Sequence, residues 1–406
     1  MAEVEQLQVT MAVQIKVNQD SYMKKILMIL LLLAGLDASF DLHAEDAEAD
    51  RYRREIGVIA RYGDILTTNG FYSGFNPLGR RLVHYESLAL QYSFAFPESS
   101  YYGSLYPSAR QGIGVGLYSF GSHDYVGTPV SLYMFQGATI ASLSEKLTLD
   151  YEWNLGLSFG WVNDSGLTAS KTNIGLGGGL FLTWRPDNRW KLTLGPEFMH
   201  HSNGDTSFPN LGTNTVGLRA GAAMGFGEKE HVQTVARLFA AEEEKKAFGE
   251  KMTYDVTLTT GWRAGRVKHP DGVRKFNYKF PIILVSAASM YHFNRYLSMG
   301  PALDMVMDRS ADLIPFAASY DFPSMWKQMA AGVGVKTEVR MNFFGVSAGG
   351  GYSFGQKGSV LTGPYGAFGL KTYVSERLSV DMKYILRNQR YTHNLTFGLG
   401  WRFGKI

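Results

Sequence analysis

The chain of 406 residues has no cysteine, so we expect neither a disulfide framework nor a thiolate metal site. Its 40 Lys and Arg nearly balance 36 Asp and Glu, which leaves a formal net charge of +4. This scattered charge gives no footprint for a nucleic-acid partner. No segment reaches the ~18 consecutive apolar residues of a transmembrane helix, so a helical membrane protein is excluded as well.

Glycine and aromatic residues are plentiful where proline is scarce. The chain has 46 Gly, 23 Tyr and 14% aromatic residues against only 13 Pro. Many short strands with aromatic ends have this composition, and a helical enzyme does not. The length is enough for one large barrel or two ordinary domains.

A targeting segment stands near the start of the chain. Met23, Lys24 and Lys25 form a basic n-region, and residues 26–36 are an unbroken apolar run. Such a run is too short to cross ~30 Å of hydrocarbon as a helix. We therefore expect a signal peptide over residues 23–44, cleaved after Ala38 or Ala44, with residues 1–22 an unstructured upstream extension. The alternative is a retained anchor on a soluble protein.

From about Asp50 onward, segments of alternating polarity are separated by turns, which is typical of an outer-membrane β-barrel. We predict one transmembrane antiparallel up-and-down barrel over residues 45–406, with about sixteen strands (range 12–16). The alternative is a large soluble β-sandwich. The expected strands are 54–64, 82–97, 110–119, 128–142, 146–161, 172–185, 189–202, 213–226, 252–265, 278–291, 295–307, 329–341, 344–354, 362–373, 376–387 and 391–403.

The connections between these strands alternate in length. Short turns such as 144–146 and 186–188 fit the periplasmic side, and longer ones such as 65–81, 162–171 and 203–212 fit the extracellular side. The segment 227–251 interrupts this order and is either a short amphipathic helix or an extra strand. The last strand, 391–403, alternates apolar and polar residues as a barrel wall does.

Polar residues interrupt the apolar face at the adjoining ends of two strands. His200 and Ser202 share parity with the apolar residues of strand 189–202, and Asn214 shares parity with those of strand 213–226. A serine, a histidine and an amide are the parts of a nucleophile, a base and an orienting group. Polar groups facing lipid are candidates for function. The opposing interpretation is that they begin a wet loop at the membrane interface.

The string His-x-Ser-Asn followed by Pro-Asn-x-Gly resembles the active-site motif of outer-membrane lipid A 3-O-deacylases, the PagL family, and of longer relatives called acyloxyacyl hydrolases. The matching residues, over a resemblance of about 52–227, are His200, Ser202, Pro209, Asn210 and Gly212. The resemblance implies that His200 is the general base, that Ser202 is the nucleophile and that an acid following the Gly orients the histidine. Asn214 stands where the compact enzymes carry Glu. An amide can hold the ring but supplies no full charge.

These residues together with the resemblance predict a serine ester hydrolase, and the resemblance implies that it acts on lipid A of lipopolysaccharide among outer-membrane lipids. Ser202, His200 and Asn214 would be catalytic, and Asn203 or the turn at Gly204 would donate to the oxyanion, supported by Asn210. The site should face the outer leaflet. We expect no cofactor or metal, since the nine His form no ligand-spaced cluster. The alternatives are a non-enzymatic barrel, whether pore or structural protein, and a phospholipase-type esterase.

One further pair has a simpler interpretation. His201 and Glu197 share the opposite parity and should face the barrel interior. We expect them to be an interior contact and not a second site. Oligomeric state is not encoded in any of these patterns.

Overall fold

The structure is a computed structural model of the whole chain. It describes residues 53–226 and 251–404, except residues 98–102, 104–105, 270–271, 317–318, 322, 342, 358, 376 and 388–391. The predicted signal peptide and all of the segment 227–251 except its last residue lie outside the described residues. No helix among the described residues is long and apolar enough to cross a membrane.

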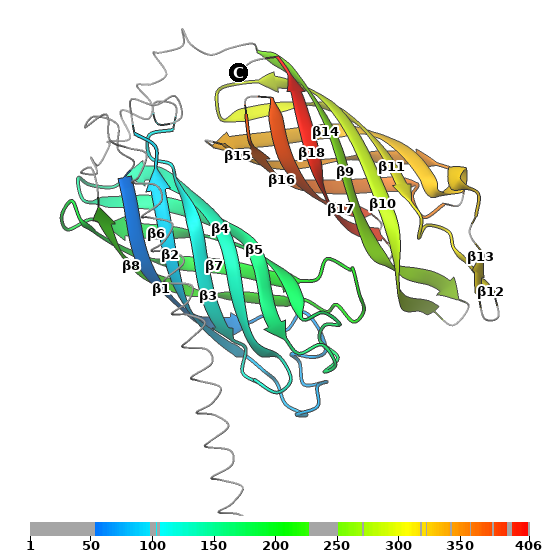
Figure 1. Cartoon of the computed structure of the whole chain (residues 1–406), viewed down its shortest axis with the longest axis horizontal. Helices are drawn as coiled ribbons and strands as arrows, with labels where there is room; N and C mark the ends of the chain where they lie inside the picture. The colour runs from blue at the N-terminus through cyan, green and yellow to red at the C-terminus, as the bar shows by residue number, and fades with distance from the viewer. Residues whose placement is uncertain are drawn as a thin grey trace, which may run out of the picture. The chain divides into compact units, whose positions relative to one another are not determined.

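The first eight strands close into a barrel, in which each strand pairs antiparallel with the next and β8 pairs with β1 (Figure 1). Their bounds are β1 Arg53–Ile65, β2 His84–Ala95, β3 Arg110–Ser119, β4 Gly127–Ser142, β5 Leu147–Trp161, β6 Thr172–Trp184, β7 Trp190–Ser202 and β8 Thr213–Phe226. Closure leaves no edge strand, so every strand of the wall has a partner on both sides.

Eight later strands close into a second barrel, in which β18 pairs with β9. Their bounds are β9 Met252–His269, β10 Gly272–His292, β11 Leu297–Asp308, β14 Met329–Met341, β15 Phe344–Gly355, β16 Gly363–Tyr373, β17 Leu378–Arg387 and β18 Thr392–Phe403. A small hairpin, β12 Ile314–Phe316 with β13 Ser319–Asp321, and a 3₁₀ turn, η2 Met325–Gln328, lie in the connection before β14.

All sixteen predicted strands are present, which confirms the transmembrane antiparallel β fold. They form two rings of eight, and the single ring of sixteen that we expected is not what forms. The alternation of side chains along each strand is the same in both arrangements. The difference lies in the two seams, β1 with β8 and β9 with β18, and these join residues far apart in sequence.

Strand ends agree with expectation to within about two residues, with one exception at the turn between β9 and β10. Here β9 runs to His269 and β10 begins at Gly272, so the ribbon is longer at this turn than predicted. Residues 266–277 are basic and polar and suggested a loop. The backbones of residues 266–269 nevertheless pair with those of residues 272–275, and the register shifts between Phe276 and Lys279.

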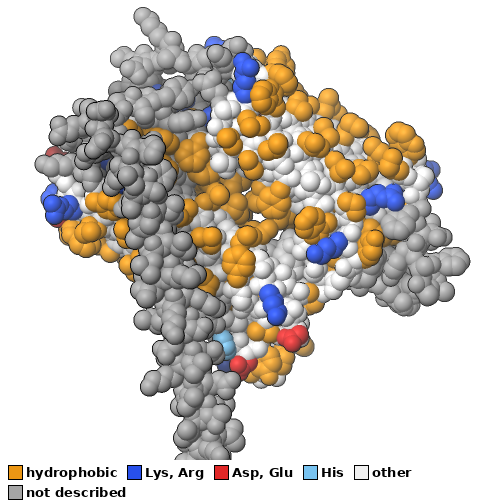
Figure 2. Space-filling model, viewed as in Figure 1, with side chains coloured by type: hydrophobic (Ala, Val, Ile, Leu, Met, Phe, Trp, Pro, Cys, Tyr) orange, Lys and Arg blue, Asp and Glu red, His pale blue; other side chains and the backbone are white. Residues whose placement is uncertain are grey.

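Apolar side chains point outward along the strands. On β7, for example, Leu192, Leu194 and Phe198 are exposed, whereas the intervening Lys191, Thr193 and Glu197 are buried. Figure 2 shows hydrophobic side chains over much of the strand surface on one face, with few charged groups among them. An outside that is apolar and an inside that is polar are what lipid requires of a barrel wall.

The lumen of the first barrel is filled by paired charges. Arg219 lies 2.6 Å from Glu152 and 3.5 Å from Glu197, and Glu197 also pairs with Arg61. Arg110, at the start of β3, pairs with Asp150 at 3.2 Å. An eight-stranded barrel is just wide enough for side chains to fill it. Burial leaves these charges little water, so each depends on its partner.

The second barrel is filled in the same way by other residues. Asp255 lies 2.6 Å from Lys371 and 2.7 Å from Arg402, and Glu338 lies 3.1 Å from each of these two cations. The hydroxyl of Tyr373 donates to Glu338. Lys336 lies 3.5 Å from Glu338 in the same cluster, and the network ties strands β9, β14, β16 and β18 across the lumen.

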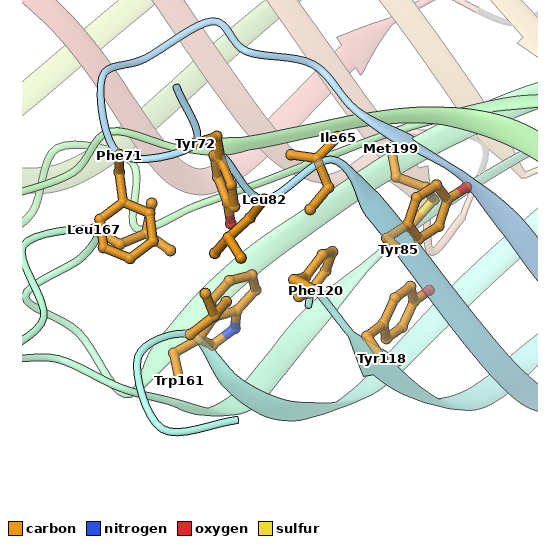
Figure 3. Close-up of a cluster of buried hydrophobic side chains, with 11 residues drawn as sticks. Ile65, Phe71, Tyr72, Leu82, Tyr85, Tyr118, Phe120, Trp161, Leu167 and Met199 are labelled. Carbon is orange, nitrogen blue, oxygen red and sulfur yellow. The ribbon is translucent and has the colours of Figure 1, made fainter. Parts of the chain in front are cut away.

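One end of the first lumen is closed by an apolar plug. Phe71, Tyr72 and Leu82, from the connection between β1 and β2, reach in to meet aromatic side chains of the strands (Figure 3). The full plug is Ile65, Phe71, Tyr72, Leu82, Tyr85, Tyr118, Phe120, Val126, Trp161, Leu167 and Met199. These residues lie at the end of the barrel that carries the long connections, so the plug fixes those connections against the wall.

The lumenal network gives a testable prediction. Arg219→Met would leave Glu152 and Glu197 each short of one cation in a buried site. We expect the free energy of unfolding to fall by about 3–5 kcal/mol, as when one partner of a buried pair is removed. Urea titration in detergent or lipid vesicles measures this loss. Leu218→Val, on the exposed outer face of the same strand, is the control. An unchanged midpoint for Arg219→Met would contradict the role of the network.

Candidate active site

The predicted catalytic residues come from the adjoining ends of β7 and β8. His200 is directly opposite Asn214 in the register of the two strands, and Ser202 ends β7. His200, Ser202 and Asn214 are half-buried, and the residues that continue their outer faces are exposed. The structure therefore has the parity expected from the sequence, with all three side chains on the outer side of the wall.

Two hydrogen bonds join these three side chains in a row. His200 Nδ1 lies 2.6 Å from Asn214 Oδ1, and His200 Nε2 lies 3.0 Å from Ser202 Oγ. Because an amide oxygen only accepts, Nδ1 holds the ring proton and donates it to Asn214. Nε2 is then free to accept the hydroxyl hydrogen of Ser202, which is the arrangement of a nucleophile with its base and orienting group.

The loop after β7 turns back sharply beside Ser202. Gly204 has φ +65°, and its N–H points to Ser202 Oγ over 3.4 Å. Asn203 uses its donors within the loop, because its N–H donates to Asn210 Oδ1 and its side-chain amide donates to the carbonyl of Ser207, both at 3.0 Å. Of the two expected sources of an oxyanion donor, the N–H of Gly204 is thus the one that points to the serine. Asn210 holds the loop in shape.

Gly212 sits directly against the imidazole. Its φ is +72°, in the left-handed region that favours glycine, and an added Cβ would lie 3.3 Å from His200 Cε1. Glycine is needed here for two reasons, the backbone conformation and the space beside the ring. The residue that the sequence motif singles out therefore has a physical role in placing the histidine.

The connection after β1 packs against the start of β8 and supports the site from the other side. The N–H of Leu66 donates to the carbonyl of Asn214 at 2.8 Å, and Asn69 Nδ2 donates to the carbonyl of Gly212 at 2.8 Å. The hydroxyl of Tyr72 lies 2.7 Å from Thr213 Oγ1, and burial raises the pKa of Tyr72 above its usual range. Asn214 also donates from Nδ2 to Thr68 Oγ1 at 2.9 Å.

His201 points the other way, into the lumen, as its parity predicts. It is packed among aromatic rings, with centroids 5.3 Å from Tyr118 and 5.8 Å from Phe120. The expected contact with Glu197 does not form, because the Glu197 carboxylate accepts from Arg61, Asn154 and Arg219 instead. The aromatic plug, which the alternation of polarity does not reveal, encloses His201.

Sequence reasoning found the three catalytic candidates and the loop that follows them. It missed Thr68, which is 146 residues from Asn214 in the chain. Knowledge that β1 pairs with β8 would have identified it, because this pairing places the polar residues after β1 beside the start of β8. Among the described residues, no group of three or more His, Asp or Glu is arranged to hold a metal ion.

The fit of Gly212 against His200 can be tested by adding one methyl group. Gly212→Ala strains the backbone by roughly 1–2 kcal/mol and moves the imidazole. We expect turnover to fall about tenfold or more, since a small misplacement of a reacting group is costly. Gly166→Ala is a matched control, because Gly166 also has positive φ, at +94°, with nothing within 4 Å of the added Cβ. Equal activity of the two variants would contradict this role.

Comparison with known proteins gives matches to both halves of the chain. The family described as lipid A 3-O-deacylase (PagL) matches residues 62–223, and the family described as acyloxyacyl hydrolase, C-terminal domain, matches residues 252–405. A search of curated proteins finds no match.

Solved structures that resemble the chain include the outer membrane enzyme PagL, with 17% identity and a TM-score of 0.30, covering 41% of this chain and 97% of that one. Another is Neisserial surface protein A, with 13% identity and a TM-score of 0.29, covering 43% of this chain and 96% of that one. The family assignment rests on the two family matches, which span both barrels. The chain belongs to the family of lipid A 3-O-deacylases (PagL) and acyloxyacyl hydrolases.

Proposed function

We propose that this protein is an outer-membrane serine esterase that removes an ester-linked acyl chain from lipid A, with His200, Ser202 and Asn214 as its catalytic residues. The observation that carries the proposal is the hydrogen-bonded row of these side chains on the outer face of the barrel. The family match over the first barrel supports the same substrate class.

The position of the row favours a substrate that lies in the membrane. Leu176 on β6 is paired directly opposite His200 on β7 and is exposed. Phe198 on β7 and Val216 on β8 continue this apolar surface. An acyl chain can lie against these side chains while its ester reaches Ser202 at the strand end. A water-soluble substrate would gain no binding energy from contact with these apolar side chains.

In the first half of the reaction, Ser202 Oγ forms a bond to the ester carbonyl carbon while its proton passes to His200 Nε2. The oxygen of the tetrahedral intermediate takes the negative charge, and the Gly204 N–H, which points to Ser202 Oγ, would donate to it. The carbon–oxygen bond to the sugar then breaks, and His200 gives its proton to the leaving oxygen. The acyl chain remains on Ser202.

In the second half, a water molecule loses a proton to His200 Nε2 and attacks the acyl carbon. The bond to Ser202 Oγ breaks, the proton returns to Oγ, and the fatty acid leaves. Asn214 stabilises the ring in both halves by accepting from Nδ1. As an amide it orients the imidazolium without a full opposing charge.

A pore is the less favoured alternative for the first barrel. Its lumen holds the ion pairs of Arg61, Glu197, Arg219 and Glu152, and the apolar plug closes one end. A water-filled channel needs a wider ring than eight strands provide. An esterase acting on glycerophospholipid would use the same three residues, and the identity of the released acid distinguishes it from the lipid A enzyme.

Removing either reacting group should stop the reaction. Ser202→Ala and His200→Ala should each lower fatty-acid release by several orders of magnitude, because such residues act as a unit. Mass spectrometry of lipid A from cells with each variant measures the loss. Ser207→Ala, in the same loop, and His84→Ala, an exposed histidine, are the controls. Near-normal activity of Ser202→Ala would show that another group is the nucleophile.

The orientation of the site can be tested because the chain has no cysteine of its own. Asp164, in the loop between β5 and β6, is exposed at the end of the barrel that carries the site, and Glu145 is exposed in the turn between β4 and β5 at the other end. Asp164→Cys should react with an impermeant thiol reagent on intact cells. Glu145→Cys should react only after the outer membrane is broken. The reverse pattern would place the site at the inner leaflet.

A further inference from the structure

An amide in the orienting position has a difficulty that a carboxylate does not have. Both oxygens of a carboxylate accept, so either can receive the His200 Nδ1 proton. The two ends of the Asn214 amide differ, because Oδ1 accepts and Nδ2 donates. A turn of 180° about the last side-chain bond would exchange them at little steric cost. The site therefore requires something that distinguishes the two orientations.

Thr68 is in the position to stabilise the orientation that places Oδ1 toward His200. Its Oγ1 accepts from Asn214 Nδ2 at 2.9 Å, on the opposite side of the amide from His200. The backbone holds Thr68 in place, since its N–H donates to the carbonyl of Leu66 at 2.8 Å. The N–H of Leu66 in turn donates to the carbonyl of Asn214, also at 2.8 Å. Both partners of the side-chain bond are thus fixed relative to each other.

We propose that Thr68 is a positioning residue that holds the Asn214 amide with Oδ1 toward His200 while the ring carries the proton taken from Ser202. The proposal rests on the proposed function and deepens it, because it adds a fourth member to the row of Ser202, His200 and Asn214. Thr68 acts through Asn214 and has no contact with the reacting atoms.

The reversed amide would inactivate the site. With Nδ2 toward the ring, His200 Nδ1 would have to accept, and the ring proton would move to Nε2. Nε2 would then face Ser202 Oγ as a donor and could not take the hydroxyl proton. A Thr hydroxyl can donate as well as accept, so in the resting state it can bond either end of the amide, and the charged ring is what selects between the two orientations. During the reaction the imidazolium donates from both nitrogens, and only Oδ1 can receive the Nδ1 proton.

The role of Thr68 follows from the charge that appears in the transition state. The imidazolium strengthens its bond to Oδ1 and polarises the amide, which makes Nδ2 a better donor to Thr68 Oγ1. Loss of the Thr68 hydroxyl should therefore reduce turnover and leave substrate binding unchanged. A carboxylate in place of the amide has no wrong orientation, so the effect of Thr68 should depend on the residue at 214.

The test is a double-mutant cycle on the full-length chain. Thr68→Val keeps the shape and removes the hydroxyl, and we expect kcat to fall about three- to tenfold with KM unchanged. Thr68→Ser should restore kcat to within about twofold of wild type. In an Asn214→Asp background, whatever its own turnover, Thr68→Val should change kcat by less than about twofold. Folding of every variant is checked by the heat-dependent shift in gel mobility.

A second readout does not depend on lipid A. The rate at which a fluorophosphonate probe labels Ser202 reports activation of the nucleophile, and it should show the same dependence on Thr68 and Asn214. Labelling that follows this pattern in a chain that releases no fatty acid from lipid A would support the positioning role and overturn the proposed substrate.

Three outcomes would overturn the role of Thr68. One is wild-type kcat and labelling for Thr68→Val. Another is an equal loss with Asn and with Asp at position 214, which would mean that Thr68 only supports the loop. The last is a wild-type chain that neither labels nor hydrolyses, since Ser202 would then have no activation to maintain.

Discussion

A backbone surrounded by lipid must satisfy its own hydrogen bonds, and a strand can do so only if it has a neighbour on each side. In this protein the requirement is met twice, because β8 returns to β1 and β18 returns to β9. The first of these seams also builds the candidate active site. It places the connection after β1 beside the start of β8, where Leu66 and Thr68 hold Asn214.

The small size of each ring has a second effect. With eight strands the lumen holds only side chains, and here these are ion pairs with an apolar plug at one end. The interior is therefore occupied by groups that stabilise the barrel, and the proposed catalytic residues lie on the outer wall. A membrane lipid meets the barrel at this outer wall. A lipid substrate could therefore reach these residues without entering the filled lumen.

Sequence periodicity was sufficient for the strands and for the direction of each side chain. His200, Ser202 and Asn214 could be placed on one face from parity, and the structure joins them by hydrogen bonds. Closure could not be predicted in this way, because each strand pairs with its neighbour in sequence whether the ring has eight strands or sixteen. A ring of sixteen would have put β1 beside the last strand and Thr68 far from Asn214. The aromatic enclosure of His201 was missed because its members come from separate strands and a loop.

The two short seams also bear on how the chain reaches this structure. Residues paired across the β1–β8 seam are about 150 to 170 positions apart, whereas a single ring would have joined strands at opposite ends of the chain. The entropy lost on closing a loop grows with the logarithm of its length, by only ~0.6 kcal/mol per doubling, so the equilibrium gain is small. The kinetic gain is larger, since folding rates fall with the average sequence separation of contacts. The first barrel, with all its site residues between Thr68 and Asn214, can therefore close without any strand of the second.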